Sequence, residues 1–135
     1  MPLILVRHGS AGDRDEWNAD DRERPLDKRG RRQARELVSR LAAYRIDEIH
    51  TSPYLRCVQT VEPLAAARDL ELRLRAELSE EGQGRDGDAL LRELADRGAV
   101  VCGHGGLDNA LRGAPKWRKG SAFVLDRDLR VVEQI

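Results

Sequence analysis

Two short stretches of the chain place a histidine beside glycine directly after an apolar run. The stretch "LILVRHGSAG" contains Arg7 and His8, and "VVCGHGG" contains His104, so two of the three histidines occupy this kind of position. The apolar runs predict buried strands over Leu3–Val6 and Ala99–Cys102. Because ligands bind where the carboxyl ends of parallel strands meet, we expect His8 and His104 to lie close together.

Two arginines are expected to join the histidines. Arg7 precedes His8, and Arg56 lies in the first turn of the helix predicted after a second strand, Ile46–Thr51. Guanidinium groups match the oxygens of phosphate, and backbone N–H groups in glycine turns and at helix N-termini add donors. We therefore predict an anion site, with substrate contacts from the turn residues Gly9, Ser10 and Gly105.

The predicted chemistry is phosphoryl transfer without a metal or another cofactor. A neutral imidazole can attack phosphorus as a nucleophile, and a second imidazole can stabilise charge on the transferring group. We therefore expect a phosphohistidine intermediate on one of the two histidines. The alternative is that both are satisfied core histidines, which the flanking glycines and Arg7 make less favourable.

The composition limits the class of protein. The 135 residues suit one domain, 1–135, and 24 Lys and Arg balance 24 Asp and Glu, so no basic excess points to nucleic acid. No apolar run approaches the roughly 18 residues of a membrane span, and the start resembles no signal peptide. Two cysteines give no disulfide framework, so we expect a cytoplasmic protein that acts without a membrane.

Alternating strand and helix patterns predict an α/β protein, a three-layer α/β/α sandwich with a mostly parallel central sheet. Asp27 is the expected N-cap of a helix to Tyr44, and Ser52 that of a helix to about Ala67, which Pro63 is expected to kink or end. The remaining expected elements are a short strand at Leu70–Leu74, a helix at Asp88–Asp96 capped by Asp88, a short helix at Leu107–Leu111, and two final strands at Ser121–Leu125 and Arg130–Ile135.

Four segments in order resemble the successive motifs of the histidine phosphatase superfamily, which includes the phosphoglycerate mutases. They are "LVRHG", "RPLDKRGRRQA", "TSPYLRCVQT" and "VVCGHGG", and their order and approximate spacing match over nearly the whole chain. The compact size is most similar to the SixA-type phosphohistidine phosphatases. The chain is also similar to phosphatase domains attached to some bacterial Nudix hydrolases.

The resemblance implies a role for each matching residue. His8 matches the nucleophile that becomes phosphorylated, and Arg7 and Arg56 match the arginines that bind phosphate. His104 matches the second histidine in contact with phosphate, and Gly105 follows it with a backbone N–H that is expected to touch the phosphate.

The sequence leaves open which residue, if any, acts as the general acid. Superfamily members that cleave alkyl phosphates use a carboxylate to protonate the leaving oxygen, and within "ELSEEG" Glu80 fits the pattern Leu-x-Glu better than Glu81. SixA-type enzymes are expected to manage without such an acid, because an imidazole leaving group is easily protonated. Both glutamates could equally be solvated loop charges.

Two residues of the loop after His8 are further candidates for substrate binding. Arg14 could meet an anion, and Trp17 could line the pocket or pack across the loop as a lid. His50 and Trp117 are expected to be structural.

The expected function is a phosphatase that acts through His8 on a phosphohistidine protein or on a small phosphorylated metabolite. The alternatives are a nucleotide phosphatase, a mutase, and a module that binds phosphate without turnover. The small size argues against the mutase, and the complete set of Arg7, His8, Arg56 and His104 argues against the binding module.

Overall fold

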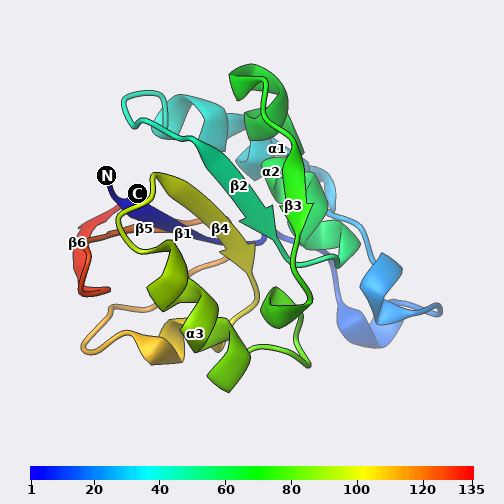
Figure 1. Cartoon of the computed structure of the whole chain (residues 1–135). Coiled ribbons are helices and arrows are strands. Elements are labelled where there is room, and N and C mark those ends of the chain that lie inside the picture. Colours follow the sequence, from blue (N-terminus) through cyan, green and yellow to red (C-terminus); the bar gives the residue numbers. More distant parts are fainter.

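A computed structural model describes residues 1–135 and contains a six-stranded sheet with helices on both faces (Figure 1). The strands and α-helices, in chain order, are β1 Leu3–Arg7, α1 Lys28–Arg40, β2 Glu48–Thr51, α2 Leu55–Arg68, β3 Leu72–Leu74, α3 Arg85–Leu94, β4 Ala99–Gly103, β5 Ala122–Leu125 and β6 Val131–Gln134. Four short 3-10 helices lie at Arg14–Glu16, Asp21–Glu23, Ala76–Leu78 and Leu107–Ala110.

The strand order places three strand ends together. The order is β3-β2-β4-β1-β5-β6, so β4 lies between β2 and β1, and all three run parallel. Arg7 at the end of β1 pairs with Gly103 at the end of β4, and Thr51 at the end of β2 pairs with Cys102. The segments that follow these strands therefore begin at one edge of the sheet, as the sequence predicted.

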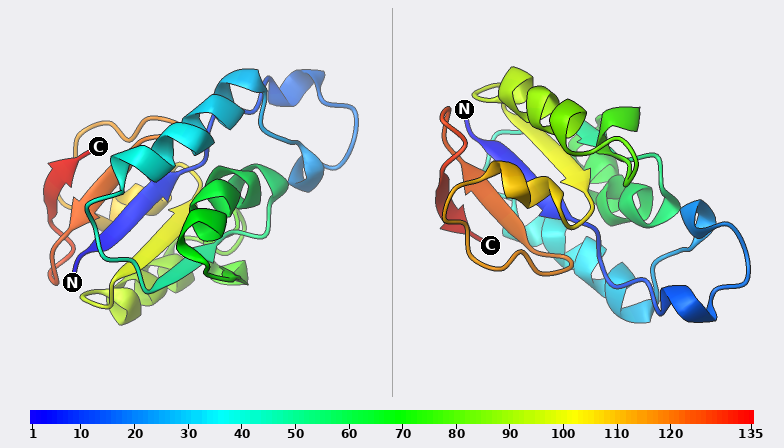
Figure 2. Two further views of the ribbon diagram at one scale, coloured as in Figure 1. Left: turned by 90° about the horizontal axis from the view of Figure 1, so that it is seen from above. Right: turned by 90° about the horizontal axis from the view of Figure 1, so that it is seen from below.

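Two apolar cores hold the layers together and confirm the predicted three-layer arrangement. The alternation of side chains along each strand sends Ile4 and Val6 to one face and Leu3 and Leu5 to the other. Helices α1 and α2 cover the first face, and α3 covers the second (Figure 2). The sheet is mostly parallel, with β5 antiparallel to both β1 and β6.

The predicted start of α1 is confirmed, whereas that of α2 was misplaced. Asp27 caps α1 and accepts a hydrogen bond from the N–H of Gly30, although the helix ends at Arg40 rather than Tyr44. In α2 the N-cap is Tyr54, whose own N–H donates to the Ser52 hydroxyl before the helix begins. Pro63 lies within α2 and does not end it.

The third helix begins earlier than predicted. It starts at Arg85 after Gly84, whose φ of 99° suits glycine, so Asp88 lies within the helix and is not its cap. Its buried leucines, Leu90, Leu91 and Leu94, belong to the core on the second face of the sheet, and Gly87 in its first turn lies against Leu107. The two final strands form the expected antiparallel pair.

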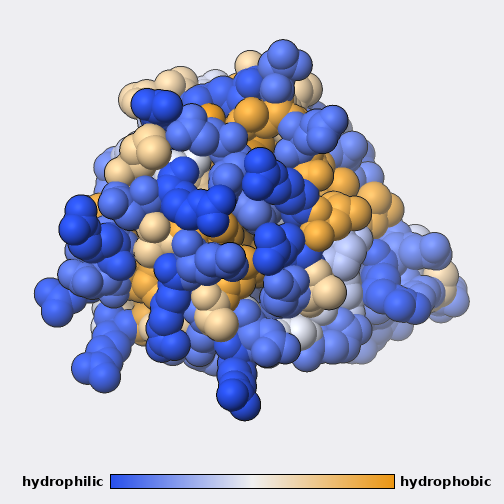
Figure 3. Space-filling model, in the orientation of Figure 1, coloured by the Kyte–Doolittle hydropathy of each residue, from blue (hydrophilic) through white to orange (hydrophobic).

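The segment between β1 and α1 projects beyond the carboxyl edge of the sheet as two 3-10 turns joined by loops (Figures 1 and 2). The face shown in Figure 3 is covered mainly by hydrophilic side chains. None of the helices has the length and apolar character needed to cross a bilayer.

Candidate active site

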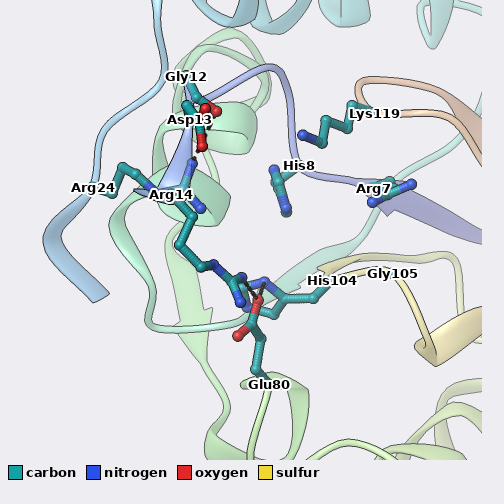
Figure 4. Close-up of a pocket in the computed structure, with 10 residues that line it drawn as sticks. All are labelled: Arg7, His8, Gly12, Asp13, Arg14, Arg24, Glu80, His104, Gly105 and Lys119. Carbon is teal, nitrogen blue, oxygen red and sulfur yellow. Dashed lines mark hydrogen bonds and ion pairs between the residues drawn. The ribbon is translucent and has the colours of Figure 1, made fainter. Parts of the chain in front are cut away.

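An open pocket of about 520 Å³ lies at the carboxyl edge of the sheet and contains no apolar lining residue. Four separate segments line it: the end of β1 with its following loop, the turn after β4, the loop before α3 and the loop before β5 (Figure 4). The lining residues are Arg7, His8, Gly12, Asp13, Arg14, Arg24, Glu80, His104, Gly105 and Lys119.

His8 presents one ring nitrogen to this pocket. Its Nδ1 lies 2.8 Å from the carbonyl oxygen of Gly9, and since a carbonyl only accepts, Nδ1 carries the proton and Nε2 keeps its lone pair. Burial lowers the pKa of His8 to about 3; the bond to Gly9 opposes this shift, and the charges of His104, Arg56 and Arg7 add to it. The ring is therefore neutral at neutral pH, and the lone pair of Nε2 is free to react.

We predict that His8 stays neutral from pH 8 down to about pH 5, well below the ordinary range of a histidine. Because the unfolded chain binds this proton near pH 6.5 and the folded chain only near pH 3, the stability contributed by a neutral His8 is lost as the pH falls between these values. An NMR titration of the ring, assigned with His8→Ala, tests this. A midpoint near 6.5 for His8 would contradict the geometry.

His104 lies beside His8 and is held by a hydroxyl. The two ring centroids are 5.4 Å apart, and Nε2 of His104 is 2.9 Å from the Ser52 hydroxyl at the end of β2. Its Nδ1 is buried without a hydrogen-bond partner and lies 3.6 Å from the Glu80 carboxylate. That nitrogen is available to a ligand oxygen in the pocket.

Arg56 is fully buried behind the pocket in the first turn of α2. Its guanidinium donates to the carbonyl oxygen of Asp21 at 2.9 Å, to the Asp21 carboxylate at 3.2 Å and to the Glu80 carboxylate at 2.9 Å. It also stands 4.9 Å from the centre of the Tyr54 ring. Two carboxylates and an aromatic ring thus fix its position, and in this structure Glu80 lies between Arg56 and Arg14.

Arg7 is held by the segment before β5. One terminal nitrogen donates to the carbonyl oxygen of Trp117 at 2.8 Å, while its Nε is buried without a partner. A Cβ at position 105 would lie 3.0 Å from this guanidinium, so glycine there allows Arg7 to pack against the turn that carries His104. Trp117 itself is buried and stacks on Phe123, which confirms its predicted packing role.

Glu80 is bound by cations on two sides. Its Oε1 lies 2.6 Å from the Arg14 guanidinium and 2.9 Å from that of Arg56. Both guanidinium groups therefore occupy the same carboxylate oxygen, with charge-assisted hydrogen bonds. Its predicted role as a general acid stays a prediction, and its position over His104 places it within reach of a bound phosphate.

Four predicted substrate contacts lie outside the pocket lining. The N–H of Gly9 donates to Thr60, Ser10 bonds to Asp27 and Gln33, and Glu81 accepts from the Tyr54 hydroxyl. Trp17 lines a smaller adjoining hollow, and its indole N–H donates to Asp20. The substrate contacts of Gly9, Ser10, Trp17 and Glu81 therefore stay predictions.

Sequence reasoning missed several residues that shape the site. Lys119 and Arg24 line the pocket, Asp21 orients Arg56, and Ser52 holds His104. Arg24 begins the segment "RPLDKRG" and Ser52 lies in "TSPYLR", so both could have been found from the motifs that contain them. Lys119 has no such signal, because only the pairing of β5 with β1 brings its loop to His8.

Neither cysteine forms a disulfide, and no group of three His, Cys, Asp or Glu side chains is placed to hold a metal ion. His50 is buried and bonds to Glu48, away from the pocket, as expected for a structural residue.

The strand ends of this doubly wound α/β sheet bring Arg7, His8 and His104 to one polar pocket, and Arg56 lies buried behind it. The family model of the Histidine phosphatase superfamily (branch 1) matches residues 3–99, and the chain belongs to this superfamily. The resemblance found in the sequence is thereby confirmed.

Individual curated proteins are also similar to this chain. The 8-oxo-(d)GTP phosphatase of Mycolicibacterium smegmatis is 37% identical over 142 residues, covering 91% of this chain and 43% of that protein. Phosphoserine phosphatase 1 of Hydrogenobacter thermophilus is 31% identical over 102 residues, covering 72% and 46%. The chain thus spans less than half the length of these relatives.

Among solved structures, the protein histidine phosphatase SixA complexed with tungstate aligns with a TM-score of 0.81 at 24% identity. The alignment covers 100% of this chain and 96% of that one. This match supports the fold.

Proposed function

We propose that this chain is a phosphatase that transfers a phosphoryl group to Nε2 of His8 and then releases it to water. The single observation that carries the proposal is the bond from Nδ1 of His8 to Gly9, which leaves Nε2 as a neutral nucleophile in a pocket of cations. Membership of the superfamily supports the same chemistry.

The first step forms a bond between Nε2 of His8 and phosphorus and breaks the bond from phosphorus to the leaving group. Arg7 and Lys119 line one side of the pocket and Arg14 and Arg24 the other, so that they can neutralise the phosphoryl oxygens. Nδ1 of His104, which has no partner in the protein, is placed to donate to one of these oxygens. In the second step water attacks phosphorus, and the electron pair of the broken P–N bond returns to His8.

The pairing of Glu80 favours substrates with good leaving groups. Oε1 of this carboxylate already accepts from Arg14 and Arg56, so we expect Glu80 to give the leaving group little help. Phosphoramidates, such as phosphohistidine, and phosphoanhydrides, such as nucleoside di- and triphosphates, meet this requirement. Alkyl phosphates do not.

We favour a nucleotide as substrate. The relative from Mycolicibacterium smegmatis is named for a nucleotide, and its similarity covers 91% of this chain. A phosphohistidine protein is the second candidate, supported by the full-length structural match to SixA and by a pocket that is open to solvent.

The experiment is a panel of initial rates of phosphate release, with His8→Ala as the blank. The panel contains a phosphohistidine protein, nucleoside mono-, di- and triphosphates, sugar phosphates and an aryl phosphate. Fast release from the di- and triphosphates supports the nucleotide proposal. Fast release from phosphohistidine and aryl phosphate alone supports the second candidate, and no release from any compound contradicts the phosphatase.

We predict that Glu80→Gln has little effect on turnover of substrates with good leaving groups. If Glu80 is no acid, kcat for an aryl phosphate or a nucleoside diphosphate changes less than about threefold, since the amide still accepts from Arg14 and Arg56. A loss of about 10²-fold or more, confined to substrates with poor leaving groups, would identify Glu80 as the general acid.

A further inference from the structure

A second polar hollow of about 340 Å³ adjoins the active site. It shares Arg7 and Lys119 with the first pocket, so the two form one continuous surface. Like the first pocket, it has no apolar lining residue. Its lining residues are Arg7, Ser10, Arg29, Gln33, Lys116, Arg118 and Lys119.

The hollow contains five cations: Arg7, Arg29, Lys116, Arg118 and Lys119. None of them forms an ion pair. Because the whole chain has a formal net charge of zero, this is a local excess of positive charge. In the first pocket, by contrast, Arg14 and Arg24 are both paired with acids.

The nearby acid, Asp27, forms no ion pair with these cations. Its carboxylate accepts from the Ser10 hydroxyl and from the backbone N–H groups of Gly12 and Gly30. Burial lowers the pKa of Lys119, the charges of Arg7, Arg24 and Arg56 lower it further, and the charge of Asp27 opposes this shift. Such concentrated positive charge is stabilised when an anion occupies the hollow.

We infer that this hollow, lined by Arg29, Lys116 and Arg118, binds a second phosphate group joined to the one that His8 receives. The inference rests on the proposed function and narrows its substrate class to phosphoanhydrides, of which nucleoside di- and triphosphates are the common kind. Arg7 and Lys119 line both hollows, so they can contact both phosphates of one anhydride. The leaving group of a phosphohistidine substrate is an imidazole, which carries no second phosphate for these cations to bind.

With such a substrate, the transfer step forms one bond to phosphorus and breaks one. Nε2 of His8 bonds to the terminal phosphorus, and the bond from that phosphorus to the bridging oxygen breaks. The bridging oxygen leaves with the electron pair as part of the remaining phosphate, whose new negative charge faces the cations of the hollow. This departure needs no proton from the enzyme, which agrees with the pairing of Glu80 to Arg14 and Arg56.

The test measures binding without turnover. Isothermal titration calorimetry compares imidodiphosphate, a pyrophosphate analogue with a bridging N–H, with inorganic phosphate. For the unaltered protein, imidodiphosphate should bind about tenfold more tightly or better, as expected for added charge-assisted contacts. In Lys116→Ala/Arg118→Ala the affinity for phosphate should stay within about twofold, and the advantage of imidodiphosphate should disappear.

A control variant removes the same amount of charge elsewhere. Arg35→Ala/Arg92→Ala changes two exposed arginines that line neither hollow, and it should keep the tenfold preference. Equal affinity of the unaltered protein for both anions, or equal loss in both double variants, overturns the subsite. If the subsite binds as predicted but no nucleotide releases phosphate, the proposed substrate fails while the second anion site stands.

Discussion

Replacing His8 with alanine is expected to lower kcat by about 10³-fold or more on every substrate that the protein hydrolyses. The imidazole supplies the attacking Nε2, and the neighbouring histidine cannot replace it, because Nε2 of His104 accepts from Ser52 and its Nδ1 then carries the proton. The cations that hold phosphate stay in place, so inorganic phosphate should still bind within a few-fold of its original affinity. Steady-state kinetics and calorimetry on the same preparation measure the two quantities.

The matched control for this prediction is His50→Ala, which removes a buried histidine outside the pocket. The folded His50→Ala variant should retain turnover. Unchanged turnover in His8→Ala would contradict the mechanism. An unaltered protein that binds phosphate but turns over no substrate would instead indicate the module that binds phosphate without catalysis.

The substitution Arg56→Ala should reduce both activity and stability. The side chain is fully buried, and its loss leaves the carboxylates of Asp21 and Glu80 and the Asp21 carbonyl oxygen without this partner. Because both carboxylates keep some contact with water and with Arg14, we expect a cost of about 2–3 kcal/mol in the free energy of unfolding. We expect kcat/KM to fall by about 10²-fold or more.

Arg14→Ala is the informative comparison for Arg56. Arg14 contacts the same oxygen of Glu80, but more than half of its side chain is exposed, so its removal should leave the free energy of unfolding almost unchanged. Thermal or denaturant unfolding together with kinetics separates the two variants. Equal, small effects on stability for both would show that the buried network around Arg56 does not hold the site together.

The sequence predicted correctly that His8 and His104 lie close together, because their positions depend on strand ends. His8 and His104 each follow an apolar run, and parallel pairing of β1 with β4 is enough to bring them together. The cap of α1 at Asp27 was equally local, since one side chain and one nearby N–H define it.

The parts that were not predicted depend on tertiary structure. Lys119 reaches the pocket only through the pairing of β5 with β1, and α3 begins after Gly84 without a side-chain cap that the sequence could reveal. The second hollow joins residues from the end of β1, from α1 and from the segment before β5. No local pattern in the chain signals that these cations share one surface or lack acidic partners.

The most direct test of the account is to trap the phosphorylated enzyme. The protein is mixed with a substrate labelled in the transferred phosphate, and the reaction is stopped with alkali within milliseconds. The account predicts protein-bound label that is stable in base, is lost in acid and maps to the peptide containing His8. It also predicts that the label appears and decays fast enough to account for turnover. Turnover without such an intermediate, or label on another residue, would contradict His8 as the nucleophile.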